Sequence, residues 1–487
     1  MLSTPLTSRH RLYIRSILVS AAISTTGCPA PCEGAGCGDL YPRASLALFR
    51  AADLVAPEVD PLAAPLAVTG TDADGFDWAV VGTGAGLLVG VPKADEVRWY
   101  DGDALTEGGA ADVLEGEAAG ERFGAAVASG TGPEGGRLLV GAPSRAGGPT
   151  LSAAGAVYVY EGTDGAVGTS GAPQVVLGVA AEDHFGEGVW ACGDLDGDGV
   201  SDWAGSAPWT SVGANQLAGS LTLGLSSTPL PAGTSSAADL PSLVGASSGA
   251  RFGAAVQCER SLDDDALAEL VVAAPYAKAI AREGAGTVSI WASPLDGAAP
   301  REPAITFEGD EPDASFGAAI AVGDLDGDGE EELVVGAPGV DGGGGDNDAA
   351  GAVFVYGGAE LHAKLASPVE AALPGPARTL RGEFARGRFG ASVAIADLDG
   401  DGIGDLVVGA PGTNRTGEAA ATRAGAAIVW WGPYTGWPAV QFMSDAPTLV
   451  AADRQHLETG GVIATADLEG DLVSELVLLT RAASEVE

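Results

Sequence analysis

The sequence predicts an all-β protein, a seven-bladed β-propeller whose blades are four-stranded antiparallel sheets. The first observation is a unit of Phe-Gly, an apolar strand, an acidic or Gly-rich loop, a second strand and Gly-Ala-Pro, which recurs seven times in 487 residues. The second is the period of these units, which exceeds that of common two-helix repeats. The third is an aromatic-rich strand after the unit, followed by an outer strand. Length alone would equally allow two or three ordinary domains.

The seven units differ in how well they keep the pattern. Residues 316–338 and 389–411 are the clearest copies and have identical internal spacing, whereas residues 123–143 keep both strands and lose the acids. The weaker copies are residues 76–92, 185–208, 252–275 and 459–480. Third strands are predicted at residues 155–162, 351–358 and 425–432, and outer strands at residues 303–309 and 377–383.

These motifs resemble FG-GAP repeats, the units of the integrin α-subunit propeller and of many bacterial surface proteins. The resemblance covers roughly residues 46–487. The Phe-Gly and Gly-Ala-Pro frame is intact in three copies; its second glycine becomes Ser206 and Ala273 in two others, and the first and last copies are degenerate. The resemblance implies a toroidal scaffold that binds calcium in its Asp-rich loops.

The last unit stops after its second strand, near Arg481, which would leave half a blade with unpaired backbone groups. Residues 45–51 read as a third strand, and residues 65–77 align without gaps on the outer-strand segment 174–186. We therefore expect the N-terminal strands to complete the last blade, so that residues 45–487 form one closed propeller.

The N-terminal residues carry the features of an export signal. Basic residues precede the apolar stretch 16–23, so residues 1–27 are interpreted as a signal peptide. Residues 25–28, TTGC, look like a bacterial lipobox, although Thr25 stands where an aliphatic residue is usual, and they predict lipidation of Cys28. Residues 28–44 would then be a linker to a lipoprotein at the outer membrane or cell surface, with a periplasmic or secreted protein as the alternative.

Charge and hydropathy exclude several kinds of partner. The formal net charge of −42 argues against nucleic acid, because phosphate binding needs clustered Lys and Arg. No run of 18 apolar residues predicts a transmembrane helix, so membrane contact is expected only through the lipid. We expect a monomer.

Five cysteines are consistent with an exported protein. Cys32 and Cys37 could form a disulfide within the linker. Cys192 and Cys258 occupy nearly equivalent places in adjacent repeats, where an interblade disulfide and two buried free thiols both fit the sequence.

Three acidic loops have the ligand spacing of a calcium site. Acids at positions 1, 3, 5 and 9 can turn toward one centre, a glycine after the third acid permits the sharp turn, and the carbonyl of the seventh residue supplies another oxygen. Oxygen ligands alone favour Ca²⁺ over transition metals. The predicted ligands are Asp194, Asp196, Asp198, Val200 and Asp202; Asp324, Asp326, Asp328, Glu330 and Glu332; Asp397, Asp399, Asp401, Ile403 and Asp405.

An EF-hand also begins DxDxDG, but its twelfth residue is a Glu between two helices. Here that place holds Gly205, Val335 or Val408, and strand-like runs flank each loop, which predicts a hairpin loop resembling the integrin-type site. Two further loops are weaker candidates that leave a fourth or fifth ion open. Their acids are Asp263, Asp265 and Glu269 in one loop, and Asp467, Glu469, Asp471 and Glu475 in the other.

No catalytic motif appears in a suitable context, so we predict a cell-surface binding or adhesion module without enzymatic activity. Apart from the predicted signal peptide the histidines are His184, His362 and His456, and His184, which precedes a Phe-Gly, is interpreted as a loop residue rather than a base. The predicted ligand is an unidentified protein or glycan, bound by the long loops opposite the carboxylate loops. Their interaction-capable residues are Trp209, Tyr276, Asn347, Asn414 and Arg415. The alternatives are a carbohydrate-active or other hydrolytic propeller with channel carboxylates, and an envelope scaffold.

Overall fold

The structure is a computed structural model, and the predicted signal peptide, Cys28, Cys32 and Cys37 lie outside its described residues. It describes residues 44–49, 54, 58–59, 66–69, 79–83, 86–101, 112–133, 135–162, 172–228, 230, 233–263, 265–279, 282–295, 302–342, 349–367, 372–413, 425–451, 459–467 and 473–481.

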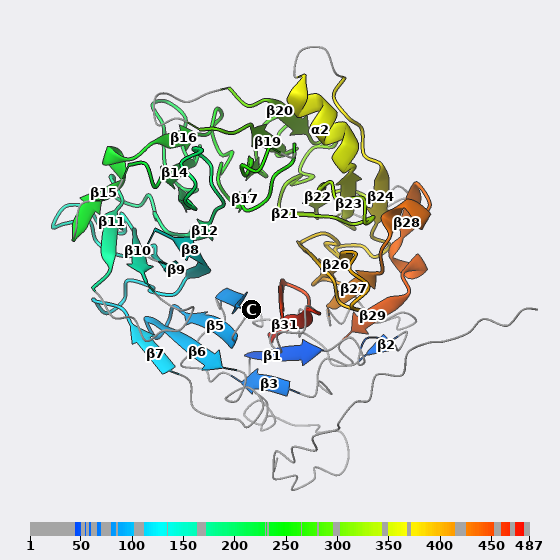
Figure 1. Ribbon diagram of the computed structural model, residues 1–487, viewed down its shortest axis with the longest axis horizontal. Helices are drawn as coiled ribbons and strands as arrows, with labels where there is room; N and C mark the ends of the chain where they lie inside the picture. The colour runs from blue at the N-terminus through cyan, green and yellow to red at the C-terminus, as the bar shows by residue number, and fades with distance from the viewer. Residues whose placement is uncertain are drawn as a thin grey trace, which may run out of the picture.

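Seven sheets stand in a ring around a central axis, with their first strands toward the centre and their outer strands at the rim (Figure 1). Neighbouring strands within the four-stranded core of every sheet are antiparallel, which confirms the predicted fold. From the centre outward, the sheets are β4 (Ala79–Thr83), β5 (Gly86–Val91), β6 (Glu96–Asp101) and β7 (Asp112–Glu115); β8 (Ala126–Gly132), β9 (Gly135–Ala142), β10 (Ala156–Glu161) and β11 (Gln174–Leu177); β12 (Gly188–Ala191), β13 (Trp203–Ala207), β14 (Ser220–Gly224) and β16 (Ser242–Val244); β17 (Ala255–Gln257), β18 (Leu270–Ala274), β19 (Thr287–Trp291) and β20 (Ile305–Glu308); β21 (Ala319–Gly323), β22 (Glu332–Ala337), β23 (Ala352–Tyr356) and β24 (Arg378–Arg381); β25 (Ser392–Ala396), β26 (Asp405–Ala410), β27 (Ala426–Trp430) and β29 (Thr448–Ala451); β30 (Val462–Ala466), β31 (Glu475–Arg481), β1 (Ala44–Phe49) and β3 (Leu66–Thr69).

The innermost strands close the ring by contacting one another in sequence. The contacts run from β4 to β8, β12, β17, β21, β25 and β30, and from β30 back to β4. The apolar core is accordingly divided among the interfaces between blades. One cluster, for example, joins Val334 and Val353 of one blade to Leu406 and Ile428 of the next. Each blade therefore depends on its neighbours for burial of its apolar side chains.

N-terminal strands complete the last blade, as the sequence predicts. Strand β1 lies between β31 and β3 and pairs antiparallel with both, with Leu46 opposite Leu479 on one side and Val68 on the other. In Figure 1 the blue β1 lies beside the red β31. The closure joins the two ends of the repeat array through main-chain hydrogen bonds, which removes an unpaired sheet edge.

Three sheets carry a short fifth strand that the sequence pattern does not reveal. Each is parallel to the outer strand of its sheet: β15 (Thr234–Ser236) pairs with β11, β28 (Val440–Phe442) with β24, and β2 (Glu58–Val59) with β29. The helix α2 (Gly358–Ala366) between β23 and β24 is also unpredicted, and its buried Leu361 and Leu365 join the core cluster of that blade. Short 3-10 turns occupy Ala237–Asp239, Tyr434–Gly436 and Met443–Asp445.

Among the described residues, the Phe-Gly motif anchors the start of five repeats. Phe123 is buried and packs edge-on against Tyr158 of the third strand, with ring centroids 5.0 Å apart, and Phe389 packs on Trp430 in the same way at 5.6 Å. The following glycine has a left-handed backbone that disfavours side chains. Gly186 has φ +89°, and a Cβ on it would lie 2.2 Å from the carbonyl oxygen of Ala156.

A disulfide joins Cys192, after β12, to Cys258, after β17 of the next blade. The Cα atoms are 4.7 Å apart and both cysteines are buried. This geometry decides between the two possibilities that the sequence leaves open, because the ends of the two inner strands meet across the blade interface.

Replacing both cysteines by alanine is expected to lower the melting temperature. Their separation of 66 residues corresponds to about 4 kcal/mol of lost loop-closure entropy in the unfolded chain. For a chain of this length, that equals about 4 °C, measurable by differential scanning calorimetry. Treatment with reductant should lower the melting temperature of the native protein by the same amount and leave that of the double variant unchanged. A melting temperature that changes neither with the substitutions nor with reductant would contradict a stabilising disulfide.

Candidate metal sites and the opposite face

The three strong acidic loops are hairpin loops between the first and second strands of their blades, as predicted. They connect β12 to β13, β21 to β22 and β25 to β26. In the first loop, Asp194 accepts hydrogen bonds from the backbone N–H groups of Gly197, at 2.7 Å, and Gly199, at 2.8 Å. Both glycines have left-handed backbones, with φ +83° and +84°. The other two loops repeat these hydrogen bonds, so one local conformation recurs three times.

In the three strong loops the acids at the first, third and ninth positions bring their carboxylates together, and in a fourth loop, which begins with Ser261, the acids at the third, fifth and ninth positions do so. In four loops, one oxygen from each of three acids lies within 4.8 Å of the other two: Asp194, Asp196 and Asp202; Asp263, Asp265 and Glu269; Asp324, Asp326 and Glu332; Asp397, Asp399 and Asp405. Asp198, Asp328 and Asp401, at the fifth position, are not in these groups and accept the N–H of the residue two places on. The side chains thus offer a compact set of oxygen donors of the type that a hard cation binds.

The acid at the ninth position of each loop, called the ninth acid below, has a second role that the sequence does not reveal. Asp202 is buried and accepts the N–H of Leu195 at 2.8 Å in its own loop and that of Ser226 at 2.7 Å just after the third strand. Glu332 and Asp405 make the corresponding pairs of hydrogen bonds. The acid therefore fastens two loops on one face of the blade. The only sequence signal is its position at the start of the second strand, directly before it for Asp202 and as its first residue for Glu332 and Asp405.

Burial makes the ninth acids resist ionisation. It raises the pKa of Asp202 to about 6, of Asp405 and Glu269 to about 7, and of Glu332 to about 8; accepted N–H groups oppose this rise and neighbouring carboxylates add to it. Burial, with nearby carboxylates, also raises the pKa of Asp399. A bound divalent cation would reverse the balance by favouring the charged forms.

In metal-free protein, the melting temperature is expected to fall as pH rises from about 5 to about 8. The folded-state pKa values of about 6 to about 8 lie above the ordinary values of 3.8 and 4.5, so folding favours the protonated acids and this contribution disappears as pH passes through the folded pKa. Scanning calorimetry of protein stripped of metal tests this. A melting temperature that rises between about pH 5 and about pH 8 would contradict this prediction. Saturating calcium should make the decrease in melting temperature with pH smaller.

The structure describes all three acids of one weaker loop and only two of the four acids of the other. Asp263, Asp265 and Glu269 are the third, fifth and ninth residues of a loop that begins with Ser261, and one oxygen of each lies within 4.8 Å of the other two. The buried Glu269 accepts the N–H of Leu262 at 2.6 Å. The sequence predicts weak or absent calcium binding here, and the structure shows that the three carboxylates nevertheless lie close together. In the last blade, Asp467 and Glu475 are described and Glu469 and Asp471 lie outside the described residues.

The opposite face carries the predicted recognition loops. Because strands alternate in direction, the loops before Phe-Gly and those between the second and third strands leave the blade at the same end, away from the carboxylate loops. Trp209 and Tyr276 lie in such loops, while Asn347, Asn414, Arg415 and His456 lie outside the described residues. His184 is also in a loop on this face, with Nε2 3.7 Å from Glu182.

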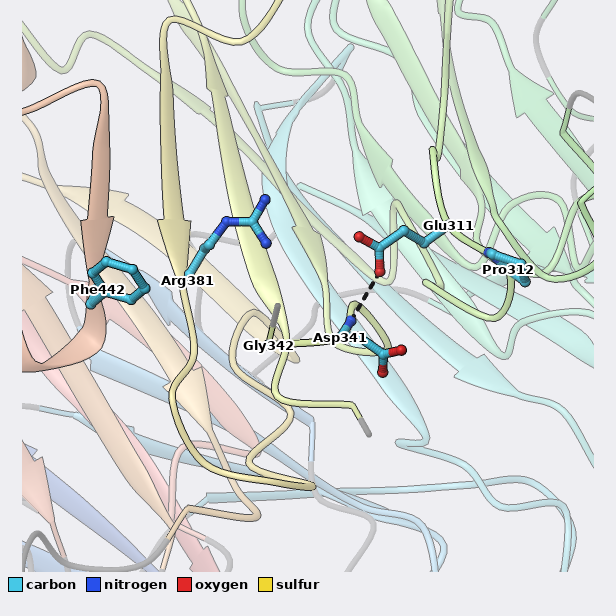
Figure 2. Close-up of a pocket in the computed structure, with 6 residues that line it drawn as sticks. All are labelled: Glu311, Pro312, Asp341, Gly342, Arg381 and Phe442. Atoms are coloured by element: carbon cyan, nitrogen blue, oxygen red, sulfur yellow. Dashed lines mark hydrogen bonds between the residues drawn. The ribbon is translucent and has the colours of Figure 1, made fainter. Parts of the chain in front are cut away.

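A hollow of about 620 Å³ opens at this end of the blade that contains β21 to β24 and β28. In Figure 2, Arg381 extends from β24 toward Glu311, and the ring of Phe442 lies beside it. Glu311 accepts the backbone N–H of Asp341 at 3.0 Å, which joins the loops from two blades. The hollow combines one cationic, one aromatic and two acidic side chains, a set that can bind a small polar group.

Among the described residues, no helix has the length and apolar character needed to cross a membrane.

Comparison with known proteins shows FG-GAP repeats in this chain. The model of the FG-GAP repeat matches residues 316–356 and 389–430, which contain two of the strong acidic loops. Human phosphatidylinositol-glycan-specific phospholipase D is 34% identical over 169 residues, which are 34% of this chain and 19% of that protein. Integrin alpha-4 of Xenopus laevis is 34% identical over 170 residues, covering 33% of this chain and 14% of the integrin. The chain thus spans about a fifth or less of these relatives' lengths.

Among solved structures, the β-propeller domain of Myceliophteria thermophila Cps50 (Swd1) aligns with a TM-score of 0.43 and 13% identity, over 83% of this chain and 95% of that chain.

Proposed function

We propose that this chain is a calcium-stabilised binding propeller of the cell surface without catalytic activity, with calcium on one face and the ligand on the other. The observation that carries the proposal is the repeated loop in which three carboxylates lie within 4.8 Å of one another. A cation bound in such a loop would offset the repulsion among its carboxylates. The FG-GAP repeats and the similarity to integrin alpha-4 support a role in binding.

The described residues fit calcium by their chemistry. Every donor in the loops is an oxygen, and the ninth acid is held in place by backbone hydrogen bonds, so the site is partly formed before the ion arrives. Asp194, Asp196, Asp198, the carbonyl of Val200 and Asp202 would hold one ion, and the corresponding residues of the other two loops would hold two more. The ion would neutralise the carboxylates and thereby stiffen the hairpins. Asp263, Asp265 and Glu269 would bind a further ion more weakly than the three strong loops, because Ser261 stands at the first position of their loop.

The proposed location follows from the N-terminal sequence. An export signal and a lipidated Cys28 would tether a monomeric propeller to the outer membrane or cell surface, with the ligand face free to meet a protein or glycan. Mass spectrometry of the mature protein tests this, because lipidation adds acyl chains to a new N-terminal Cys28.

The second candidate is an enzyme, and the relatives named phosphatidylinositol-glycan-specific phospholipase D favour it. The matched region is only a fifth of those proteins' length, so their activity need not reside in it. Hydrolysis of a glycosylphosphatidylinositol substrate by this chain, abolished by substitution of a carboxylate outside the calcium loops, would favour the enzyme over the binding module.

A screen against glycans and matrix proteins, with calcium and after its removal, tests the main proposal. We expect saturable binding to a defined ligand that weakens when calcium is removed and the loops soften. Binding to none of the panel while the protein co-purifies with envelope assembly partners would replace the proposal with the scaffold role.

A further inference from the structure

A recurring position on the recognition face carries an unusual share of arginine. The residue directly before Phe-Gly adopts the left-handed backbone in five blades: Arg122, His184, Arg251, Ser315 and Arg388, with φ between +52° and +57°. Three of these five are arginine, although Lys and Arg together number only 24 in the 487 residues. The backbone turn is therefore common to the blades, while the side chain differs and can carry function.

Arg251 is distinguished by two aromatic rings that enclose it. Its Cζ lies 4.1 Å from the ring centroid of Trp209 and 4.9 Å from that of Tyr276. The two rings come from the second-to-third-strand loops of two neighbouring blades. Backbone hydrogen bonds from Arg251 N–H to the Leu217 carbonyl, at 3.2 Å, and from Tyr276 N–H to the Ala250 carbonyl, at 3.3 Å, hold the three segments together.

The guanidinium of Arg251 lacks the acidic partner that other arginines of this chain have. Arg145 contacts Glu117 at 2.7 Å and Glu121 at 2.9 Å, and Arg137 contacts Glu161 at 2.8 Å. Among the described residues, no hydrogen bond or ion pair involves the guanidinium of Arg251, whose interactions are the two ring contacts. In so acidic a chain, a guanidinium that contacts two aromatic rings and has no acidic partner among the described residues offers its N–H edge to an oxyanion.

We propose that Trp209, Arg251 and Tyr276 bind an acidic sugar, with its carboxylate or sulfate at the guanidinium edge and its pyranose ring against Tyr276. The inference rests on the proposed function, of which it names the ligand class. Tyr276 is 46% exposed, so part of its ring remains available for the C–H face of a sugar. The site lies on an open surface formed by loops, which suits a chain-like glycan.

The acids of the carboxylate loops do not oppose this binding. The carboxylate loops lie at the other end of the blade, and a strand of five residues is about 17 Å long. Charges at that distance are largely screened at physiological ionic strength, where the Debye length is about 8 Å. Calcium in the loops would reduce the repulsion further.

Isothermal titration calorimetry with three trisaccharides tests the site in the calcium-loaded protein. Galacturonate carries carboxylates, sulfated galactose carries sulfates, and unmodified galactose is neutral. We expect at least one acidic trisaccharide to bind about tenfold or more tightly than the neutral one. Arg251→Gln should weaken that binding by about tenfold to a hundredfold, because it removes a charge-assisted hydrogen-bond donor. Tyr276→Ala should weaken it by about threefold to fivefold.

Arg388→Gln is the matched control, because Arg388 has the same position and backbone, with φ +55°, and no ring contact among the described residues. Its affinity should stay unchanged, and the melting temperatures of all variants should match the native value. The inference is overturned if Arg388→Gln and Arg251→Gln weaken binding equally, or if an acidic peptide binds at Arg251 and no acidic sugar does. Glycan or matrix-protein binding that is insensitive to Arg251 would overturn this inference alone; the absence of any ligand would also remove the proposed function.

Discussion

Deletion of residues 44–69 is expected to abolish cooperative unfolding or to lower the melting temperature by more than 10 °C. For a chain of this length, each degree corresponds to about 1 kcal/mol of unfolding free energy. The deletion removes β1, β2 and β3, and with them both outer strands of the last blade. Strands β30 and β31 would then form a two-stranded remnant with an unpaired edge, which is marginal in water. Because each blade interface shares its core with the next, loss of one blade exposes apolar surface on two neighbours.

A point variant keeps this prediction testable if the deletion fails to fold. Phe49 in β1 is 1% exposed and packs in a cluster with Leu54, Leu398 and Leu476. Phe49→Ala should cost about 3 to 5 kcal/mol through the lost contacts and the remaining cavity. Val113→Ala, in an outer strand and 48% exposed, is the control and should have little effect. If the deletion protein or Phe49→Ala melts like the native protein, the closure by β1 does not support the ring.

Calcium removal is expected to produce the second large effect. At a calcium concentration a hundred times the dissociation constant, each site stabilises the folded state by about 2.7 kcal/mol, so three sites together contribute roughly 8 kcal/mol. Chelation should lower the melting temperature by several degrees to about 10 °C, measured by scanning calorimetry with calcium and with chelator. Equal melting temperatures in the two conditions would contradict the assignment of calcium to these loops.

Asp399→Asn separates the ion's contribution from that of the loop. Asp399 is exposed and its Oδ1 accepts the N–H of Asp401 at 3.2 Å, a hydrogen bond that the amide oxygen of asparagine can keep. Without calcium the variant should be as stable as the native protein or slightly more so, because one repelling carboxylate is gone. With calcium it should lose about one third of the stabilisation. Glu115→Gln, in a blade without an acidic loop, should behave like the native protein in both conditions.

Local and periodic features of the fold could be predicted from the sequence. The Phe-Gly turn depends on a glycine whose φ of +86° at Gly390 disfavours side chains. The phenylalanine before it packs against an aromatic ring of the third strand in four of the described copies, so the motif marks the start of those blades. The acids at alternate positions of residues 397–405 converge through hydrogen bonds within the loop itself. Seven repeats predict seven blades, and the last blade is complete only when the strand at residues 44–49 joins it.

Other features depend on segments that only the closed ring brings together. The sequence allows Cys192 and Cys258 to be free or paired, and the contact between β12 and β17 decides for the disulfide. Asp202 looks like one more acid of its loop, but Ser226, from beyond the third strand, supplies the partner that makes it a clamp. The fifth strands and α2 arise from segments with no repeat pattern, so their conformation follows from the surface they pack against.

The repeats by themselves determined the number of blades, because each copy of the periodic pattern supplies one blade. The spacing of the acids determined the hairpin loops and their oxygen donors, because hydrogen bonds between residues close in sequence shape these loops. Only the tertiary structure decided which distant side chains meet: the disulfide, the buried second contacts of the ninth acids, and the two rings around Arg251. The physical reason is that these contacts form between blades or between separate loops, where ring packing sets the distances and no local pattern records them.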